Sequence, residues 1–391
     1  MHKIIIDTIN SISTVELILF GSFILCFLIQ IFYYLYFYAK PLYYQRRIKR
    51  KEISTQPAKT QPGVSVIISA KNESQNLEKF LPYILRQNYE NFEVIVVNDG
   101  STDETECVLG AFEQKYKNLY KTYIPEEAKS VSHKKLALSV GIKAAKYDIL
   151  LFTEANTQPL SKAWIRSMVQ HFDDQTEIVL GFSQLNRFGF MSKLANFDNI
   201  FFGLRYLSRA ISKRPYMGIG SNLAYRKDLF FSKKGYSKHL RLQYGEDDLF
   251  VNDFANKKNT KVEISKESVN QTNIESFKIW KEIKVRRGVT QKYYKGFAVG
   301  LWRFEYLTRF LLWGLTLAIC ILFWENIFIP AIAVVLFAIK FIVQYIIINK
   351  SAKMFTIGYF TFSLVLFDLL QPLYNIYFYL YRKFTGKNDY I

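Results

Sequence analysis

Four long apolar stretches stand out along the chain. Val15 to Tyr38 carries a charge only at Glu16, and three further stretches lie near the other end, at Tyr306 to Trp324, Ile327 to Asn349 and Met354 to Tyr381. Each reaches or approaches the ~20 residues with which an α-helix crosses the hydrocarbon core of a membrane. The pattern therefore predicts a membrane protein.

We place the membrane regions at residues 14–38 and 306–381. The first is too long for the apolar part of a cleavable signal peptide and ends in a run of aromatic residues that suits a membrane interface, so we interpret it as a retained anchor. Asp368 and Pro372 interrupt the last stretch, which either spans the membrane or lies in its interface. We expect one N-terminal and two to three C-terminal transmembrane helices.

Strand patterns alternate with helix patterns between the two membrane regions. Strand-like runs lie at 64–70, 93–98, 147–154 and 176–182, and helix-like runs lie at 75–88, 103–117, 133–146 and 161–172. This alternation predicts an α/β fold with a Rossmann-like, mainly parallel sheet. We place this domain at residues 63–295, after a basic linker at 39–62.

The net charge of +19 is concentrated after the first apolar stretch, where seven Lys and Arg residues and one Glu lie between Lys40 and Lys59. Cationic flanks of membrane spans stay on the cytoplasmic side. We therefore expect a multi-pass protein of the cell inner membrane, with residues 40 to about 305 in the cytoplasm. The charge favours contact with anionic lipids, and without a recognisable nucleic-acid-binding module we predict no nucleic-acid partner. The three cysteines lack metal-ligand spacing.

Polar residues follow three of the predicted strands at the point where each ends. Ala70 is followed by Lys-Asn-Glu, the next strand reaches Asp99, and the third runs into Glu154-Ala-Asn156. Ligands of open parallel sheets bind beyond the carboxyl ends of the strands, where the Asp99 carboxylate would accept hydrogen bonds from a base or a ribose. Asp103, with Glu106 three residues later, predicts the start of a helix instead.

These motifs carry a resemblance to a known family. In order, they are Pro62-Gly-Val-Ser-Val-Ile-Ile-Ser-Ala-Lys-Asn-Glu73, Phe92-Glu-Val-Ile-Val-Val-Asn-Asp-Gly-Ser-Thr-Asp103, the acidic motif after strand 147–153, and Gly245-Glu-Asp-Asp-Leu249. Over roughly residues 62–290 the chain resembles family 2 glycosyltransferases of the GT-A fold, and its membrane segments resemble those of bacterial members that build polysaccharides or lipid-linked glycans. The resemblance implies a nucleotide-sugar half at 63–182 and an acceptor half at 183–295.

The resemblance also implies roles for the residues at the strand ends. The nucleotide of a nucleotide-diphosphate sugar, expected to be a UDP-sugar, would lie against Ala70, Asn72, Glu73 and Asp99. Lys134, in a segment similar to the family's Gly-Lys-x-x-Ala-Leu, would face the phosphates. Alternatively, Lys134 is a solvent-exposed residue at the start of a helix.

The family usually binds Mg²⁺ or Mn²⁺ through Asp-x-Asp, and this chain has Glu154-Ala-Asn156. Alternation along an extended segment puts Glu154 and Asn156 on one face, but an amide oxygen is a neutral ligand. We predict a site for Mg²⁺ or Mn²⁺ there, weakened by Asn156. Arg287 is the one match to the Gln-x-x-Arg-Trp motif of processive members, and would supply positive charge to a phosphate or belong to a lipid-facing basic helix.

In Gly245-Glu246-Asp247-Asp248 the resemblance makes Asp247 the general base, with Glu246 orienting its neighbours and Asp248 capping the next helix. The implied reaction is inverting: an acceptor hydroxyl on a glycan or a lipid-linked acceptor displaces the nucleotide in one step, in cell-surface polysaccharide synthesis. Two alternatives remain open, a polyprenyl-phosphate sugar synthase and a degenerate nucleotide-binding membrane protein without catalysis.

Overall fold

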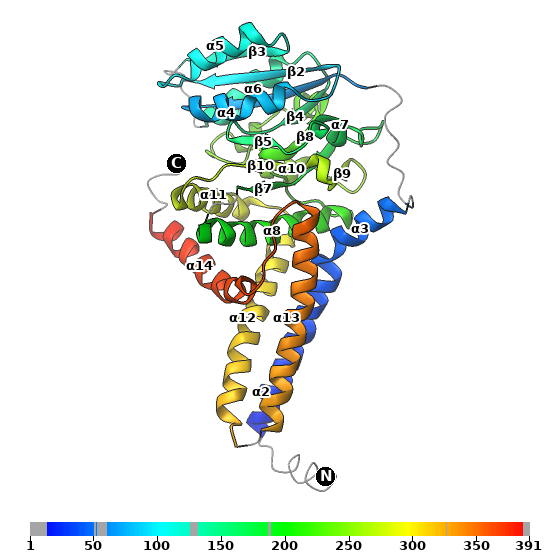
Figure 1. The fold of residues 1–391 in the computed structure, drawn as a ribbon, viewed down its shortest axis with the longest axis vertical. Helices are drawn as coiled ribbons and strands as arrows, with labels where there is room; N and C mark the ends of the chain where they lie inside the picture. The colour runs from blue at the N-terminus through cyan, green and yellow to red at the C-terminus, as the bar shows by residue number, and fades with distance from the viewer. Residues whose placement is uncertain are drawn as a thin grey trace.

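The computed structural model of the 391-residue chain describes residues 14–50, 52, 61–125, 132–186, 189–325 and 327–385. It consists of an α/β head on a stalk of membrane-type helices (Figure 1). Most of the basic linker predicted at 39–62 lies outside the described residues, but its first part continues the N-terminal helix as α3 (Lys40–Lys49).

The head is built around a seven-stranded sheet in the order β3-β2-β1-β4-β8-β6-β9. Only β8 runs against its neighbours, so the predicted mainly parallel sheet is confirmed. A smaller sheet has the order β5-β10-β7. The strands are β1 (Val64–Ala70), β2 (Phe92–Asp99), β3 (Leu119–Ile124), β4 (Ile149–Phe152), β5 (Thr157–Pro159), β6 (Ile178–Leu180), β7 (Ser183–Leu185), β8 (Leu223–Arg226), β9 (Thr260–Val262) and β10 (Asn270–Thr272).

Helices cover both faces of the large sheet because its central strands are apolar on both sides. Val64, Val66 and Ile68 of β1 pack in one core with α4 (Ser74–Leu85) and α5 (Thr105–Lys115). Ile67 points to the other core, which also contains buried residues of α6 (His133–Ala144) and α8 (Gly189–Ile211). The remaining helices of the head are α7 (Trp164–Val169), α9 (Lys227–Ser232), α10 (Asp248–Phe254) and α11 (Phe277–Thr290).

Three helices of the described chain are long and apolar enough to cross a membrane. They are Thr14–Lys49, which includes α2 (Thr14–Phe32) and the π-helical η1 (Tyr33–Tyr38), α12 (Ala298–Leu322) and α13 (Phe328–Met354). The last predicted stretch forms α14 (Ser363–Thr385), which lies obliquely below α8 and α11 rather than within the stalk (Figure 1). Of the two placements left open, the structure therefore favours the interface.

A buried network of charged residues ties α14 to the stalk. Asp368 of α14 accepts hydrogen bonds from Arg309 of α12 (3.3 Å) and from Lys340 of α13 (2.7 Å). Arg309 also pairs with Glu305 one turn earlier. All four side chains are fully buried. Unpaired charges in such surroundings are costly, so the network fixes α14 against the two spans.

Candidate active site

A polar pocket lies beyond the ends of β1, β2 and β4, and we call it the strand-end pocket. Glu73, Asp99, Lys134, Glu154 and Asn156 all line it. Parallel strands release their following residues at the same edge of a sheet, which is why residues so far apart in sequence meet here. The structure thus brings together most of the residues for which the sequence predicts a role in donor or metal binding.

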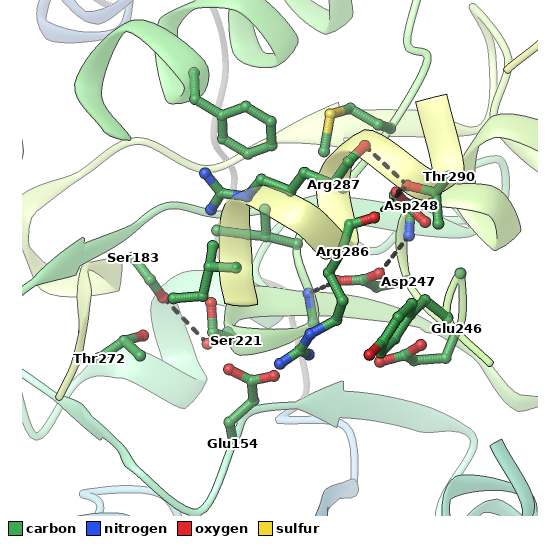
Figure 2. Close-up of a pocket in the computed structure, with 18 of the residues that line it drawn as sticks. Glu154, Ser183, Ser221, Glu246, Asp247, Asp248, Thr272, Arg286, Arg287 and Thr290 are labelled. Atoms are coloured by element: carbon green, nitrogen blue, oxygen red, sulfur yellow. Dashed lines mark hydrogen bonds between the residues drawn. The ribbon is translucent and has the colours of Figure 1, made fainter. Parts of the chain in front are cut away.

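A second cavity of about 700 Å³, counting space open to solvent, extends from the strand-end pocket toward α10 and α11 (Figure 2). We call it the inner pocket. Glu246 and Asp247 line it, and Glu154, Tyr244 and Arg286 line both cavities. The predicted base and the predicted donor site are therefore connected through one shared wall.

Asp99 ends β2 with a buried carboxylate whose Oδ1 lies 3.1 Å from Nδ1 of His133, at the start of α6. Burial raises the pKa of Asp99, and the interaction with His133 opposes that shift. His133 stands where the resembled segment has glycine, so this chain places an imidazole beside the expected nucleotide contact.

Ala70 and Asn72 do not line the strand-end pocket, although their chain neighbours Ser69, Lys71 and Glu73 do. Ala70 is buried at the end of β1. Asn72 has a φ of 55°, and its Oδ1 accepts a hydrogen bond from the N–H of Thr102 (2.9 Å). This side chain joins the loops that follow β1 and β2. A nucleotide contact by either residue stays a prediction.

Asp103 also acts on these loops. Its carboxylate accepts from the backbone N–H groups of Ser74 (3.2 Å) and Thr105 (3.0 Å), the first residues of α4 and α5. These hydrogen bonds hold the pKa of Asp103 at about 2 against the effect of burial. Asp103 therefore acts at a helix start as predicted, but it lies one residue before the N-cap of α5, which is Glu104.

Lys134 bridges two carboxylates on opposite sides of the cavities. Its Nζ lies 2.8 Å from Glu154 Oε1 and 3.0 Å from Glu246 Oε1. Burial lowers the pKa of Lys134, but the two carboxylates outweigh burial and raise it overall. Lys134 in turn lowers the pKa of Glu154 to about 2. Lys134 is therefore engaged by these two carboxylates and is not free to bind a phosphate.

Asp247 forms the N-cap of α10 at the wall of the inner pocket. Its Oδ2 accepts from the N–H of Gly220 (2.6 Å), and its Oδ1 accepts from the N–H of Asp248 (2.7 Å). Burial and the neighbouring Glu246 raise its pKa, although both N–H groups oppose the shift. A fixed carboxylate with a raised pKa is a better proton acceptor than a solvated one.

The turn before α10 depends on Gly245, which has a φ of 103°. A Cβ at this position would come within 2.4 Å of Leu249 Cδ1, so a larger residue does not fit. The cap of α10 is Asp247, not Asp248 as the sequence suggested. Asp248 instead accepts hydrogen bonds from the hydroxyls of Thr290 and Tyr294.

The two arginines of α11 point in different directions (Figure 2). Arg286 points toward Glu154, and that carboxylate together with Glu246 and Asp247 raises the pKa of Arg286 against the effect of burial. Arg287 points away from Glu154; it lies 3.6 Å from the ring centre of Phe202 and donates to Asn199 Oδ1 (3.3 Å). Arg286 is therefore the arginine that faces the shared wall, whereas the family motif matched the neighbouring Arg287.

Glu154 and Asn156 fit a divalent ion only as two oxygen ligands. Asn156 donates its amide to the carbonyl of Asn273 (3.3 Å), which leaves its Oδ1 for a ligand apart from a long contact with Thr157 (3.4 Å). Glu154 is shared with Lys134. Within the described ranges, no group of three or more His, Cys, Asp or Glu residues is placed to hold a metal. The phosphates of a donor would have to complete the coordination.

Two further residues escaped the sequence argument. Lys135 is buried, and its Nζ donates to the carbonyl oxygens of His239 (2.7 Å), Leu242 (2.5 Å) and Tyr244 (2.8 Å), which fixes the loop leading to Glu246. Arg286 carried no signal beyond its position beside Arg287. Both follow from tertiary contacts between segments more than 90 residues apart in the sequence, which local patterns do not encode.

Comparison with known proteins agrees with this geometry. Residues 65–231 match the model of glycosyl transferase family 2. The chain is 33% identical over 95 residues to poly-β-1,6-N-acetyl-D-glucosamine synthase of Staphylococcus aureus, which is 24% of this chain and 22% of that one. It is 31% identical over 125 residues to an uncharacterized glycosyltransferase of Haemophilus influenzae, which is 30% of this chain and 35% of that one. The chain thus spans about a fifth to a third of the length of these relatives.

A solved mannosyltransferase from Pyrobaculum calidifontis, in complex with GDP-Man and Mn²⁺, superposes with a TM-score of 0.54 at 17% identity. The superposition covers 92% of this chain and 99% of that one, which establishes a shared fold. Glu246, Asp247 and Arg287 lie beyond the residues matched to the family model, so their roles depend on geometry. Together, these matches and the sheet topology show a head with the GT-A fold that matches glycosyl transferase family 2 over residues 65–231 and is joined to membrane-type helices.

Proposed function

We propose that the protein is an inverting glycosyltransferase that moves a sugar from a nucleotide-diphosphate sugar, of the UDP-sugar class, to a glycan or lipid-linked acceptor at the cytoplasmic face of the inner membrane. The observation that carries the proposal is the position of Asp247. It lies on the inner pocket, held by two backbone N–H groups, and that pocket shares Glu154 and Arg286 with the strand-end pocket.

In the proposed reaction, the acceptor oxygen attacks the anomeric carbon while the bond from that carbon to the diphosphate oxygen breaks. The acceptor proton passes to the Asp247 carboxylate, whose raised pKa suits this role. The electron pair of the broken bond leaves with the nucleoside diphosphate. Attack from the side opposite the leaving group inverts the anomeric configuration.

The strand-end pocket offers suitable partners for the donor. Asp99 and Glu73 would accept hydrogen bonds from the nucleoside, while Lys134 and Arg286 would face the diphosphate. Negative charge on the diphosphate would compete with Glu154 and Glu246 for Lys134. Glu154 and Asn156 would hold a Mg²⁺ or Mn²⁺ ion, which supplies positive charge to the diphosphate when bound.

The proposed role in polysaccharide synthesis draws support from one relative. The Staphylococcus aureus protein is named for the synthesis of a polysaccharide of N-acetylglucosamine. With the membrane-type helices of this chain, it favours a role in cell-surface polysaccharide synthesis.

The proposal is tested by Asp247→Asn. This change keeps the size of the side chain and one hydrogen-bond acceptor but removes the base, so sugar transfer should fall by about 10²-fold or more. Binding of the nucleoside diphosphate, measured by calorimetry on the purified full chain, should stay within a few-fold. Asp253→Asn is the matched control, because this carboxylate lies on the same helix, lines neither pocket and pairs with Lys295, Lys238 and His239. Transfer by Asp247→Asn within a few-fold of the natural protein would contradict the assignment of the base.

A further inference from the structure

A third cavity lies where the head meets the stalk, between α8, α11, α12 and α14, and we call it the basic cavity. Its volume is about 1320 Å³, counting space open to solvent. Phe202 and Arg287 line both this cavity and the inner pocket, so the two are neighbours. In Figure 1, α14 lies beside the upper end of α12 and below α11, at the level where the stalk begins.

Positive charge dominates the lining of the basic cavity. The charged lining residues are one acid, Asp198, and five bases, Arg205, Lys284, Arg287, Arg303 and Arg382. Two of these bases are neutralised inside the protein. Lys284 pairs with Asp198 (2.9 Å), and Arg205 pairs with Glu305 (3.1 Å).

Three guanidinium groups remain without an ion pair among the described residues, on Arg287, Arg303 and Arg382. Arg382 lies directly against α11, since a Cβ on Gly288 would come within 1.8 Å of its Nη1. Burial and then Arg303 lower the pKa of Arg382, with Tyr379 opposing; burial also lowers the pKa of Arg287. Asp198 offsets only part of this charge, because its carboxylate already accepts hydrogen bonds from Lys284, Gln371 and Tyr374.

The outer part of the basic cavity is apolar. Leu307 and Phe310 of α12 and Ile376 of α14 line it, and each leaves about half of its surface exposed. Two of the three belong to a helix that is apolar enough to cross a membrane. A ligand that fits this lining has a strongly negative head at one end and a hydrocarbon chain at the other.

We propose that the basic cavity binds the phosphate groups of a lipid-linked acceptor, with its hydrocarbon chain along α12 and α14 and its glycan extending past Phe202 into the inner pocket. This inference rests on the proposed function and names its acceptor class. It explains why Arg287, which points away from Glu154, still lines the inner pocket: it stands between the acceptor phosphate and the site of transfer.

The test uses the full chain in detergent, with farnesyl diphosphate as the probe. A saturating concentration of UDP is present throughout, so that the probe cannot occupy the donor site. Binding is compared between the natural protein, Arg303→Gln/Arg382→Gln on α12 and α14, and the control Lys278→Gln/Lys383→Gln, which removes two exposed cations from α11 and α14 outside the cavity lining. Farnesol and inorganic diphosphate separate the contributions of the chain and the head.

We expect the arginine double variant to bind farnesyl diphosphate at least about tenfold more weakly, because it loses two charge-assisted contacts. The lysine control should bind it normally, and farnesol and inorganic diphosphate should each bind much more weakly than the probe. Equal binding by both double variants would overturn the inference. So would inorganic diphosphate binding as tightly as the probe, or phosphatidylglycerol displacing the probe at equal concentration, because a free anion or any anionic lipid would then suffice.

Two further measurements keep this inference separate from the proposed function. Asp247→Asn should bind farnesyl diphosphate normally, so that a failure of transfer does not count against the cavity. Normal UDP binding and sugar transfer without any binding of the probe would overturn the cavity and leave the transferase intact. Should the arginine double variant not fold, Leu307→Trp takes its place by narrowing the apolar end, and unchanged probe binding in that variant would overturn the inference.

Discussion

Glu154 is the residue on which the chemistry of the two pockets converges. It lines both cavities, lies 2.8 Å from Lys134 and faces Arg286. A single carboxylate near two cations is already neutralised, so a divalent ion gains little negative charge from this site before the donor arrives. Metal binding and donor binding should therefore be coupled, since the diphosphate brings the missing charge.

Restoring a carboxylate at position 156 tests this arrangement. Asn156→Asp should lower the Mn²⁺ concentration for half-maximal transfer by roughly tenfold, because affinity follows the charge of the ligand set. Glu154→Gln should raise that concentration. Metal titrations of activity, with Mn²⁺ binding followed by electron paramagnetic resonance, measure both effects. If transfer survives EDTA and ignores both substitutions, the ion is unnecessary and Lys134 and Arg286 supply the positive charge.

For single residues, the sequence predicted which side chains belong to the site but not which of them point toward one another. Asp99 and Glu154 could be found because they end or follow recognisable strands, whereas Asp247 was found through the family resemblance of its motif. The orientation of Arg286 and Arg287 could not, since adjacent residues of a helix differ by about 100° in direction. Only the packing of α11 against Phe202 decides which guanidinium reaches Glu154.

At the scale of elements, Asp103 links two helices that begin at the strand ends. It accepts hydrogen bonds from the first N–H groups of α4 and α5 and from the hydroxyl of Ser74 (2.7 Å). The loop before α4 supplies Lys71 and Glu73 to the lining of the strand-end pocket. Asp103 thus also holds in place a loop against which a donor would lie.

Asp103→Ala should therefore destabilise the head by about 1–2 kcal/mol, the usual cost of losing caps of this kind. The apparent melting temperature of the full chain should fall by roughly 2–8 °C. Asp174→Ala, which removes an exposed aspartate from a surface turn, should leave it unchanged, and Asp103→Asn should lie between the two. A melting temperature equal to that of the natural protein would show that neither helix depends on this carboxylate.

The alternation of strands and helices up to residue 182 could be predicted because buried parallel strands are continuous apolar runs. β3 was missed because only Leu119 and Ile124 at its two ends are buried, while the residues between are partly or fully exposed. α14 was ambiguous because an interfacial helix and an interrupted span differ in their surroundings more than in their composition. Its position is set by Asp368, whose partners lie on other helices.

At the scale of the whole molecule, the stalk separates the head from the turn between α12 and α13, and the two should lie on opposite sides of the membrane. The turn between α12 and α13 is at the far end of the stalk from the head (Figure 1). Cys107 is exposed on α5 of the head, whereas Cys26 is buried and Cys320 is partly buried in the stalk helices. The natural cysteines therefore already include a reporter for the head.

Topology is tested with a thiol reagent that does not cross membranes. Cys107 should resist labelling in intact cells and react once the cells are opened, if the head is cytoplasmic. In a Cys107→Ser background, Glu325→Cys at the exposed turn between α12 and α13 should react in intact cells. Labelling of Cys107 in intact cells, with protection at position 325, would reverse the proposed orientation and remove the head from the nucleotide-sugar pool.

The buried Asp368 has a consequence for how the protein is made. Among the described helices of the membrane region, α14 is the last to be translated, so α12 and α13 leave the ribosome before Asp368 does. Arg309 has Glu305 as a partner during that interval, whereas Lys340 waits with an unpaired ammonium group on a membrane helix. A chain that stops short of Asp368 keeps this exposed liability, and we expect the cell's membrane proteases to recognise it as unfinished.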